Sequence, residues 1–317
     1  MIQINRREFI KATSLITAGV LANRPLFSSG LKAESTAGPV CVFAKCLQFL
    51  DHDMLAQTIA KIGFDGADLP VRKGGYVLPE NVKVDLPKVV KTLQRSGLKV
   101  PMMVTDINAP DYPGIERVLE TASSLGITHY RMGYLAYDPA KTIPQNLDEH
   151  KKTMEKLEKV NRKYNIHGEY QNHSGTRVGG PVWDVYWILK DCDPAYIGSQ
   201  YDIRHATVEG GNSWPVGMNL LAPWIKTTDI KDFLWKKENG KWQVINVPLG
   251  EGQVDFDAYF KEYTRLGISG PVSMHFEYDL GGAESGNTNP TMSHDKISIY
   301  LKNDLTWFRA KLKEHRL

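Results

Sequence analysis

The feature that most constrains the fold of this chain is an alternation of short apolar runs with amphipathic stretches. The first apolar run covers residues 40–44, and residues 54–62 then carry apolar side chains at helical spacing before Gly63. The same pair of patterns recurs eight times between residues 39 and 313. Strands that alternate with helices in this way form a parallel sheet.

Eight strand and helix pairs in one chain fit a closed (β/α)8 TIM barrel of the α/β class. An open, doubly wound sheet is the main rival, but no Gly-x-Gly-x-x-Gly motif follows the first strand. We therefore predict one barrel domain over residues 36–317. Its strands are expected at residues 40–44, 65–69, 100–104, 129–132, 166–171, 197–202, 225–230 and 272–276. Its helices are expected at residues 54–62, 86–95, 115–125, 147–164, 182–190, 214–221, 256–266 and 295–313. The Asn239-Gly240 pair between two apolar runs predicts an additional hairpin after the seventh strand.

Residues 1–35 are predicted to be a targeting segment and linker outside the barrel. Arg6 and Arg7 form a twin arginine, Phe9 and Lys11 follow, and residues 12–22 are small and apolar. This pattern resembles a twin-arginine (Tat) export signal, which implies a periplasmic location. An amphipathic N-terminal helix is the alternative. The remaining sequence has no apolar run of transmembrane length, so we expect no stable membrane insertion.

Charge and cysteine content exclude some classes of protein. The formal net charge is +3 over 317 residues, without a long basic block, so we expect no nucleic-acid partner. The three cysteines, Cys41, Cys46 and Cys192, are an odd number and give no disulfide framework. We predict that they are buried rather than catalytic.

Polar side chains gather where each predicted strand ends, which is where TIM barrels carry their chemistry. In the segment VSMHFEY, His275 and Glu277 alternate with apolar neighbours and so share one face. The residues at the strand ends are Lys45, Asp68, Arg72, Thr105, Asp106, Arg131, Glu169, Gln171, His173, Asp202, Arg204, His205, Asp229, Lys231, His275 and Glu277. Converging carboxylates in a barrel mouth need a cation to offset desolvation and repulsion. That cation is either a divalent metal or the side chains of Arg131, Arg204 and Lys231.

Five phrases, in their order and spacing, resemble a known family. They are IGFDGADL after the first helix, YQNHSG at strand five, YDIRHATVEGG at strand six, TDIKDF at strand seven and MHFEY at strand eight. From residue 40 to about residue 312 the chain is similar to the sugar isomerase/epimerase superfamily with a xylose isomerase-like TIM barrel. The resemblance implies a divalent metal held by residues of strands five to eight. It also implies isomerisation or epimerisation next to a sugar carbonyl.

Two of the four ligand positions implied by the resemblance depart from the family pattern. The family's strand-five glutamate falls on Gln171 and its strand-seven histidine on Asp229, whereas Asp202 and Glu277 match. The resulting oxygen-rich set favours Mg²⁺, Mn²⁺ or Ca²⁺ over Zn²⁺. Glu169, the only acid of strand five, is expected one layer deeper in the barrel than Gln171.

The expected activity is that of a sugar or keto-sugar isomerase or epimerase. Glu277 would remove the proton next to the carbonyl, with Lys231 and His205 as further catalytic groups. The predicted substrate-binding residues are Lys45, Arg72, Arg131, Glu169, His173, Arg204 and His275. A 3-keto-glycoside lyase, which needs only one base, and a non-catalytic sugar-binding barrel are the alternatives. A metal-dependent hydrolase or endonuclease is a third, and a homo-oligomer is compatible with the sequence.

Overall fold

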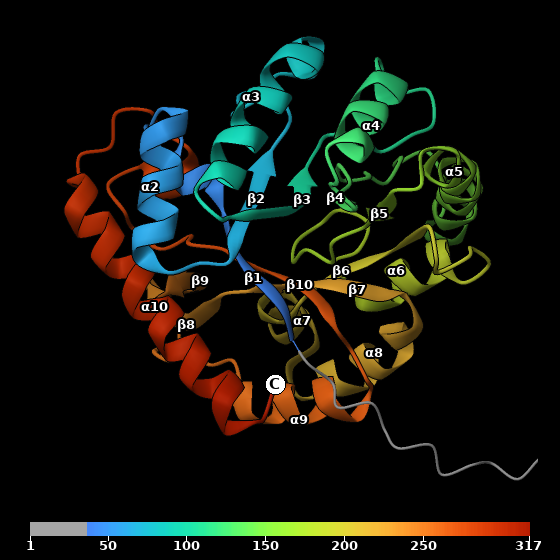
Figure 1. The fold of residues 1–317 in the computed structure, drawn as a ribbon. Coiled ribbons are helices and arrows are strands. Elements are labelled where there is room, and N and C mark those ends of the chain that lie inside the picture. Colours follow the sequence, from blue (N-terminus) through green and yellow to red (C-terminus); the bar gives the residue numbers. More distant parts are fainter. Residues whose placement is uncertain (1–36) are drawn as a thin grey trace, which may run out of the picture. The chain divides into compact units, whose positions relative to one another are not determined.

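The computed structural model describes residues 37–317, so the predicted export signal lies outside the described residues. Eight parallel strands close into a barrel in the order β1-β10-β7-β6-β5-β4-β3-β2, as shown in Figure 1. The predicted TIM barrel is confirmed. The strands are β1 (Ala37–Phe43), β2 (Gly66–Pro70), β3 (Lys99–Val104), β4 (His129–Arg131), β5 (His167–Glu169), β6 (Ile197–Asp202), β7 (Ile225–Ile230) and β10 (Gly270–Met274).

The α-helices form a ring around the barrel, except that α7 (Ile203–Gly210) is seen inside this ring in Figure 1. They are α2 (His52–Ile62), α3 (Val82–Arg95), α4 (Ile115–Ser124), α5 (Ile143–Tyr164), α6 (Val182–Leu189), α7 (Ile203–Gly210), α8 (Trp214–Leu221), α9 (Phe256–Arg265) and α10 (His294–Glu314). Short 3-10 turns are η2 (Ala44–Leu47), η3 (Pro79–Asn81), η4 (Gly211–Ser213), η5 (Ala222–Trp224) and η6 (Ala283–Ser285). No helix within the described part of the chain is long and apolar enough to cross a bilayer.

Local sequence signals set the helix ends. The Asp51 side chain accepts a hydrogen bond from the Met54 backbone at the start of α2, and Gly63 ends that helix at φ 106°. Helix α5 begins with a capping box, in which Thr142 and Gln145 each bond the backbone of the other. Gly63 thus begins the turn that leads from α2 to the following strand β2.

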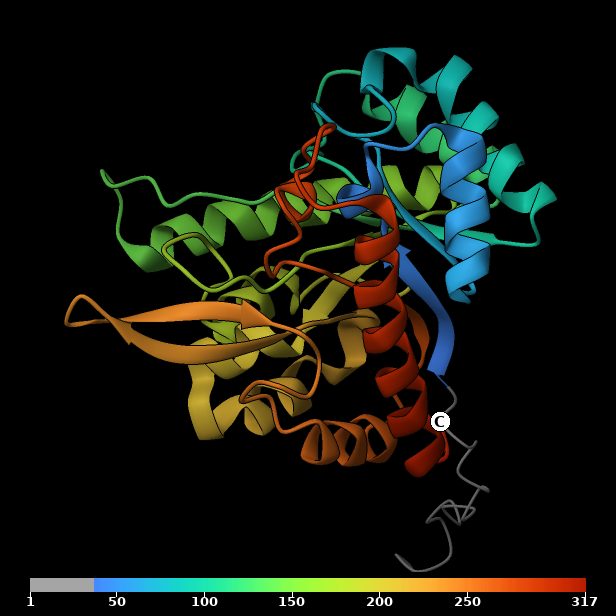
Figure 2. The ribbon, with the colours of Figure 1, turned by 90° about the vertical axis from the view of Figure 1, so that its left-hand side faces the viewer.

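The predicted hairpin is confirmed. Strands β8 (Asp232–Glu238) and β9 (Lys241–Val247) pair antiparallel around Asn239 and Gly240. Figure 2 shows this hairpin projecting away from the start of β1. It therefore stands at the end of the barrel where the strands finish, beside the expected site.

Alternate residues of each strand face either the helices or the inside of the barrel. The Tyr130 hydroxyl donates to Asn161 Oδ1 of α5 over 2.8 Å, so this side chain points outward. Ser273 of β10 donates to Asp68 Oδ2 of β2 over 2.7 Å, across the intervening strand β1. A bond between strands that are not neighbours crosses the barrel interior. Further polar residues are buried in the barrel interior. They are Arg131, Glu169, Gln200, Asp202 and Asp229.

Three differences from the sequence prediction bear on the site. Helix α7 was not expected, and it forms because Asp202 ends β6 and at once caps the helix by accepting from the His205 backbone over 3.0 Å. Strand β5 ends at Glu169 rather than at residue 171, and β10 covers residues 270–274 rather than 272–276. Consequently Gln171, His275 and Glu277 lie just beyond their strands.

Candidate active site

Two adjacent carboxylates form the floor of the barrel mouth. Asp202 and Asp229 are Cα partners in the β6–β7 register, and both side chains are fully buried. Asp229 Oδ1 accepts from Gln200 Nε2 over 2.7 Å and lies 3.2 Å from His275 Nε2. Two buried carboxyl groups this close require compensating donors or charges, which the neighbouring residues supply.

Gln171 bridges the two carboxylates in a fixed orientation. Its Oε1 accepts from Arg131 Nη1 over 3.0 Å and also from the Tyr134 hydroxyl. Because an arginine can only donate, the other end of the amide must be the nitrogen. That nitrogen donates to Asp202 Oδ2 over 2.9 Å and to Asp229 Oδ2. Gln171 therefore acts as a donor toward both acids.

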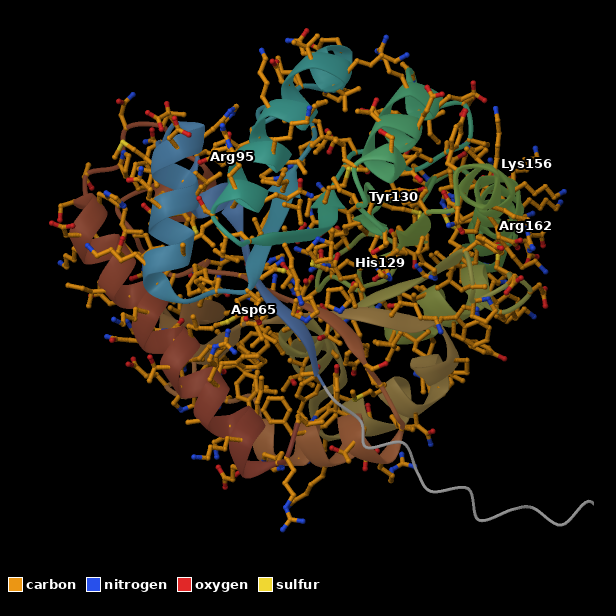
Figure 3. The ribbon with its side chains drawn as sticks, viewed as in Figure 1. Asp65, Arg95, His129, Tyr130, Lys156 and Arg162 are labelled. Atoms are coloured by element: carbon orange, nitrogen blue, oxygen red, sulfur yellow. The ribbon has the colours of Figure 1, made fainter. Side chains whose placement is uncertain are left out.

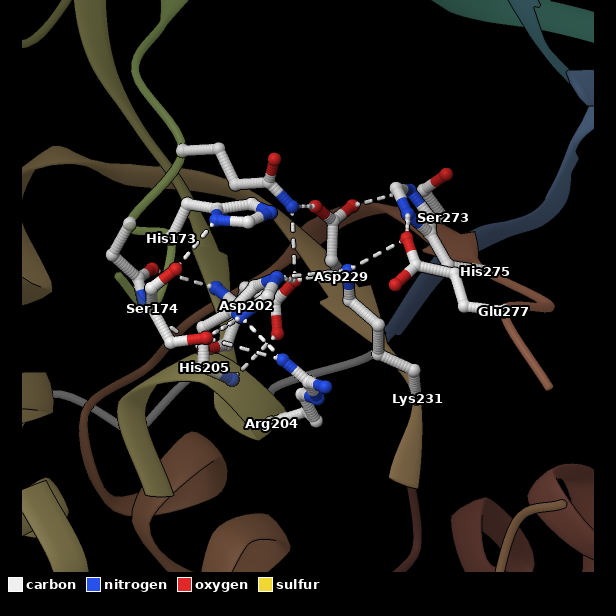
Figure 4. Close-up of polar contacts among 12 residues, drawn as sticks. His173, Ser174, Asp202, Arg204, His205, Asp229, Lys231, Ser273, His275 and Glu277 are labelled. Carbon is white, nitrogen blue, oxygen red and sulfur yellow. Dashed lines mark hydrogen bonds and ion pairs between the residues drawn. The ribbon is translucent and has the colours of Figure 1, made fainter. Parts of the chain in front are cut away.

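Lys231 supplies the buried positive charge (Figure 4). Its Nζ lies 3.1 Å from Asp202 Oδ2, 3.1 Å from Glu277 Oε1 and 3.0 Å from His205 Nε2. Burial opposes ionisation, but the charges of the surrounding carboxylates outweigh it and raise the pKa of Lys231. Lys231 is thus a permanent ammonium, suited to stabilise a developing negative charge rather than to accept a proton.

Glu277 is the accessible carboxylate of the cluster. Its side chain is 23% exposed, whereas those of Asp202 and Asp229 are 0% exposed. Burial acts to raise the pKa of Glu277, but Lys231, His275 and Lys45 together bring this pKa well below its ordinary value. Burial acts to lower the pKa of His275, but the interactions of this ring with Asp229 and Glu277 are stronger and raise it. At neutral pH the Glu277 carboxylate is ionised and able to accept a proton.

His205 connects Lys231 with the rim. Its ring is buried, and burial together with the charge of Lys231 lowers its pKa well below the ordinary value, so the imidazole is neutral. Its Nδ1 lies 2.8 Å from Ser174 Oγ and 2.8 Å from Arg204 Nη1. Arg204 Nη2 also donates to Asn246 Oδ1 over 2.6 Å. Because Asn246 belongs to β9, the hairpin anchors Arg204 at the mouth.

Three further predicted binding residues surround one aromatic ring. The cationic groups of Lys45, Arg72 and Arg131 lie 5.6 to 5.7 Å from the centroid of the Phe43 ring. His275 stacks on the same ring with centroids 4.6 Å apart. A pocket of about 380 Å³, lined by Arg72, Arg131, Tyr134 and Arg177 among others, adjoins this cluster. This cationic side of the mouth suits an oxygen-rich ligand.

The structure separates the two remaining predicted residues. His173 lies in the mouth, with its ring centroid 3.9 Å from that of His205, and burial lowers its pKa to about 4. Glu169 instead lies deeper in the barrel, where it contacts His129, His167 and Thr227. Its side chain is 1% exposed and none of these partners is in the mouth. The sequence-based placement of Glu169 below Gln171 agrees with this arrangement, but its predicted contact with substrate does not.

The predicted metal ligands Gln171, Asp202, Asp229 and Glu277 come together, but as arranged they do not fit a divalent cation. Gln171 presents its NH₂ group to the two aspartates, and the Lys231 ammonium lies between Asp202 and Glu277. The three carboxyl groups are offset by the cationic side chains of Lys231 and Arg131 and by His275, whose pKa is raised. Among the described residues, the His, Cys, Asp and Glu groups spaced to hold a metal lie elsewhere.

Several residues of the site were not expected from the sequence. Phe43, Tyr134, Ser174, Gln200 and Asn246 all contact the predicted residues. The sequence could have indicated Gln200, because this residue lies two positions before Asp202 on the same strand and so faces the same side. It could not have indicated Asn246, since nothing in the sequence fixes how far the hairpin folds back over the mouth. The three cysteines are free and buried, as predicted.

Comparison with known proteins identifies the family of the barrel. Residues 56–292 match the family described as xylose isomerase-like TIM barrel, so the chain belongs to that family. A sequence comparison with curated proteins finds no match.

Solved structures with the same fold include several sugar epimerases. D-psicose 3-epimerase from Clostridium cellulolyticum H10 is 12% identical, with 86% of this chain and 98% of that chain covered at a TM-score of 0.64. 3-Keto-D-glucoside 4-epimerase from E. coli is 17% identical, with 82% and 94% covered at a TM-score of 0.57. L-ribulose 3-epimerase is 13% identical, with 89% and 96% covered at a TM-score of 0.66. At these identities the likeness concerns the fold.

Proposed function

We propose that the protein is an enzyme that removes a proton next to the carbonyl group of a sugar or keto-sugar. The observation that carries the proposal is the contact of an accessible, ionised carboxylate, Glu277, with a buried ammonium, Lys231. A base beside an electrophile is what enolisation needs, since one takes the proton and the other stabilises the oxygen that becomes negative. The epimerases that share the fold support a sugar substrate.

The reaction would begin with the substrate carbonyl oxygen accepting a hydrogen bond from Lys231 Nζ. Glu277 takes the proton from the adjacent carbon, the electron pair of that C–H bond forms a carbon–carbon double bond, and the π pair of the carbonyl group moves onto its oxygen to give an enediolate. Return of a proton to the other face of the carbon gives the epimer, and return to the neighbouring carbon gives the isomer. His205, whose Nε2 lies 3.0 Å from Lys231 Nζ, acts as a positioning residue for that ammonium.

One observation favours β-elimination from a 3-keto-glycoside as the second candidate. Glu277 is the accessible carboxylate in the mouth, whereas Asp202 and Asp229 are fully buried. Epimerisation usually employs two bases on opposite faces of the carbon, but elimination needs one. In elimination the enediolate expels the oxygen substituent at the β position, and the departing oxygen takes up a proton.

The test combines metal analysis with isotope exchange. The purified protein is assayed for bound metal, and a panel of free sugars and 3-keto-glycosides is incubated with it in D₂O. We expect deuterium at the carbon next to the carbonyl, and a roughly 10²–10⁴-fold loss of this exchange in Glu277→Gln. An epimer and an unsaturated product, distinguished by NMR, separate the two reactions. Tight sugar binding with no exchange on any panel member would instead indicate a non-catalytic binding barrel.

A further inference from the structure

We propose that the chain carries a zinc site at the opposite end of the barrel from the active site, formed by His129, His167 and Glu169. Glu169 Oε1 lies 3.3 Å from His167 Nδ1 and 3.8 Å from His129 Nε2. The three ligand atoms all lie within 4.8 Å of one another. Figure 3 labels His129 inside the ring of helices, seen from the end where β1 begins.

The hydrogen bonds of the two imidazoles determine which nitrogen atoms face the carboxylate. His167 Nε2 lies 3.2 Å from the carbonyl oxygen of Pro194, which can only accept, so this nitrogen carries the proton. In a neutral ring the opposite atom, Nδ1, is then a bare acceptor. It has no hydrogen-bond partner and faces Glu169 Oε1, which is also buried without one.

His129 is oriented by the same logic. The Thr128 hydroxyl donates to the carbonyl oxygen of Pro101, so Thr128 Oγ1 must accept from His129 Nδ1 at 2.8 Å. The free acceptor of His129 is therefore Nε2, the atom that faces Glu169. Burial lowers the pKa of His129, which keeps its ring neutral. His167 Nδ1, His129 Nε2 and Glu169 Oε1 thus converge without a hydrogen bond between them, an arrangement that a cation would stabilise.

The chemistry of the donor set selects zinc. Two imidazole nitrogens and one carboxylate oxygen form a known type of three-ligand zinc set, which leaves a fourth position for water. Ligand atoms of a tetrahedral site are about 3.4 Å apart when each metal bond is about 2.1 Å. The pair of His167 and Glu169 already has this spacing, whereas His129, within 4.8 Å of both ligand atoms, has to move inward to reach it. The His129 side chain is 21% exposed, so the ion can enter from that end.

Groups behind the ligands hold the arrangement. Pro194 and Thr128 fix the two rings, and the Thr227 hydroxyl donates to the other oxygen of Glu169. Metal-bound histidines usually donate their second ring nitrogen to a carbonyl or similar acceptor in this way. Gly198 makes room for His167, because a Cβ there would lie 2.9 Å from the imidazole. The interior of β4, β5 and β7 is thus built around these three side chains.

Calorimetric titration of the full chain with Zn²⁺ tests the proposal, together with Co²⁺ absorption spectra. We expect one zinc ion per chain at this site and intense visible bands typical of four-coordinate Co²⁺. His167→Ala and the more exposed His129→Ala should each weaken binding roughly 100-fold or more, and Thr227→Val about 10–100-fold. The matched control is Glu277→Gln, which alters the mouth and should leave this binding unchanged.

Circular dichroism and Tm checks show whether the variants fold, and His129→Ala is informative even if His167→Ala does not fold. Absence of zinc binding to the wild-type chain would overturn the proposal. Binding that survives His129→Ala but is lost in Glu277→Gln would also overturn it, because the ion would then belong to the mouth. The activity of the mouth does not enter either readout, so failure here leaves the proposed sugar chemistry unaffected.

Discussion

Lys231 Nζ lies 3.1 Å from Glu277 Oε1, which joins the proposed electrophile directly to the proposed base. The ammonium keeps the pKa of Glu277 low, so that the carboxylate is ionised before substrate arrives. A carboxylate with a very low pKa is a weak base. A substrate oxygen that accepts a hydrogen bond from Lys231 shares the positive charge of the ammonium with Glu277. The pKa of Glu277 therefore rises at the point in the reaction where it must take the proton.

Replacing Lys231 with methionine should change both stability and the pH dependence of exchange. The variant leaves Asp202 and Glu277 without their cation, and breaking a buried pair costs about 3–5 kcal/mol. The depressed pKa of Glu277 contributes stability that is present above its unfolded pKa of about 4.3 and is lost as pH falls through its folded value. We therefore expect Lys231→Met to be destabilised more at pH 7 than at pH 3 in urea unfolding.

The same variant should raise the pKa of Glu277, because the charge that lowers it is gone. Any residual deuterium exchange should then show its acidic limb at higher pH than in the wild type. Lys236→Met, which removes an exposed ammonium of the hairpin, is the control and should leave both profiles unchanged. An unshifted acidic limb in Lys231→Met would mean that Glu277 is not the titrating base.

Gln171→Glu tests the predicted divalent metal. The substitution replaces an amide that donates to Asp202 and Asp229 with a carboxylate that repels them. Without a divalent ion we expect a loss of roughly 1–3 kcal/mol, the cost of leaving buried acceptors unsatisfied, with Arg131 offsetting part of it. If the mouth can accept Mn²⁺ or Mg²⁺, the ion should restore Tm in the variant far more than it raises Tm in the wild type. Equal Tm values with excess EDTA and with excess Mn²⁺ would argue against a metal in the mouth of either protein.

Asn246→Leu should loosen the mouth without changing the side chain of the proposed base, Glu277. Asn246 accepts from Arg204 Nη2 over 2.6 Å and donates to the backbone carbonyl of Glu277 over 3.2 Å. Losing both bonds should cost roughly 1–3 kcal/mol and weaken substrate binding more than it slows exchange at saturation. Gln243→Ala, on the exposed part of the same strand, is the control. Equal sugar affinity in the wild type and Asn246→Leu would show that the hairpin does not shape the site.

The sequence predicts the barrel well because the alternation of strand and helix patterns is local and repeated eight times. It also finds Asp202, Asp229, Lys231 and Glu277, since polar residues at strand ends are conspicuous there. It does not reveal that Gln171 faces the acids with its nitrogen, because that orientation depends on Arg131, forty residues away in the chain. Similarly, the pairing of Glu169 with His129 and His167 depends on the register of β4 and β5, which alternation alone leaves open.

Asp304 offers a pH test that is independent of the active site. Its carboxyl group is buried in α10 beside Tyr278, which donates to Oδ2 over 3.1 Å. Burial raises its pKa to about 7, although the Tyr278 bond acts in the opposite direction. A folded pKa raised above the unfolded value of about 3.9 means that stability is lost as pH rises between these two values.

Asp304→Asn removes this titration while keeping the shape of the side chain. Relative to the wild type, the variant should therefore gain stability between pH 4 and pH 8, by up to about 4 kcal/mol. Asp257→Asn is the matched control, and its stability should respond to pH in the opposite direction. The reason is that hydrogen bonds with Lys311 and His315 lower the pKa of Asp257. That variant should lose stability relative to the wild type as pH rises. Urea unfolding of all three proteins at several pH values measures both trends, and a parallel response of the two variants would contradict the assignment of Asp304 as a buried, largely protonated acid below neutral pH.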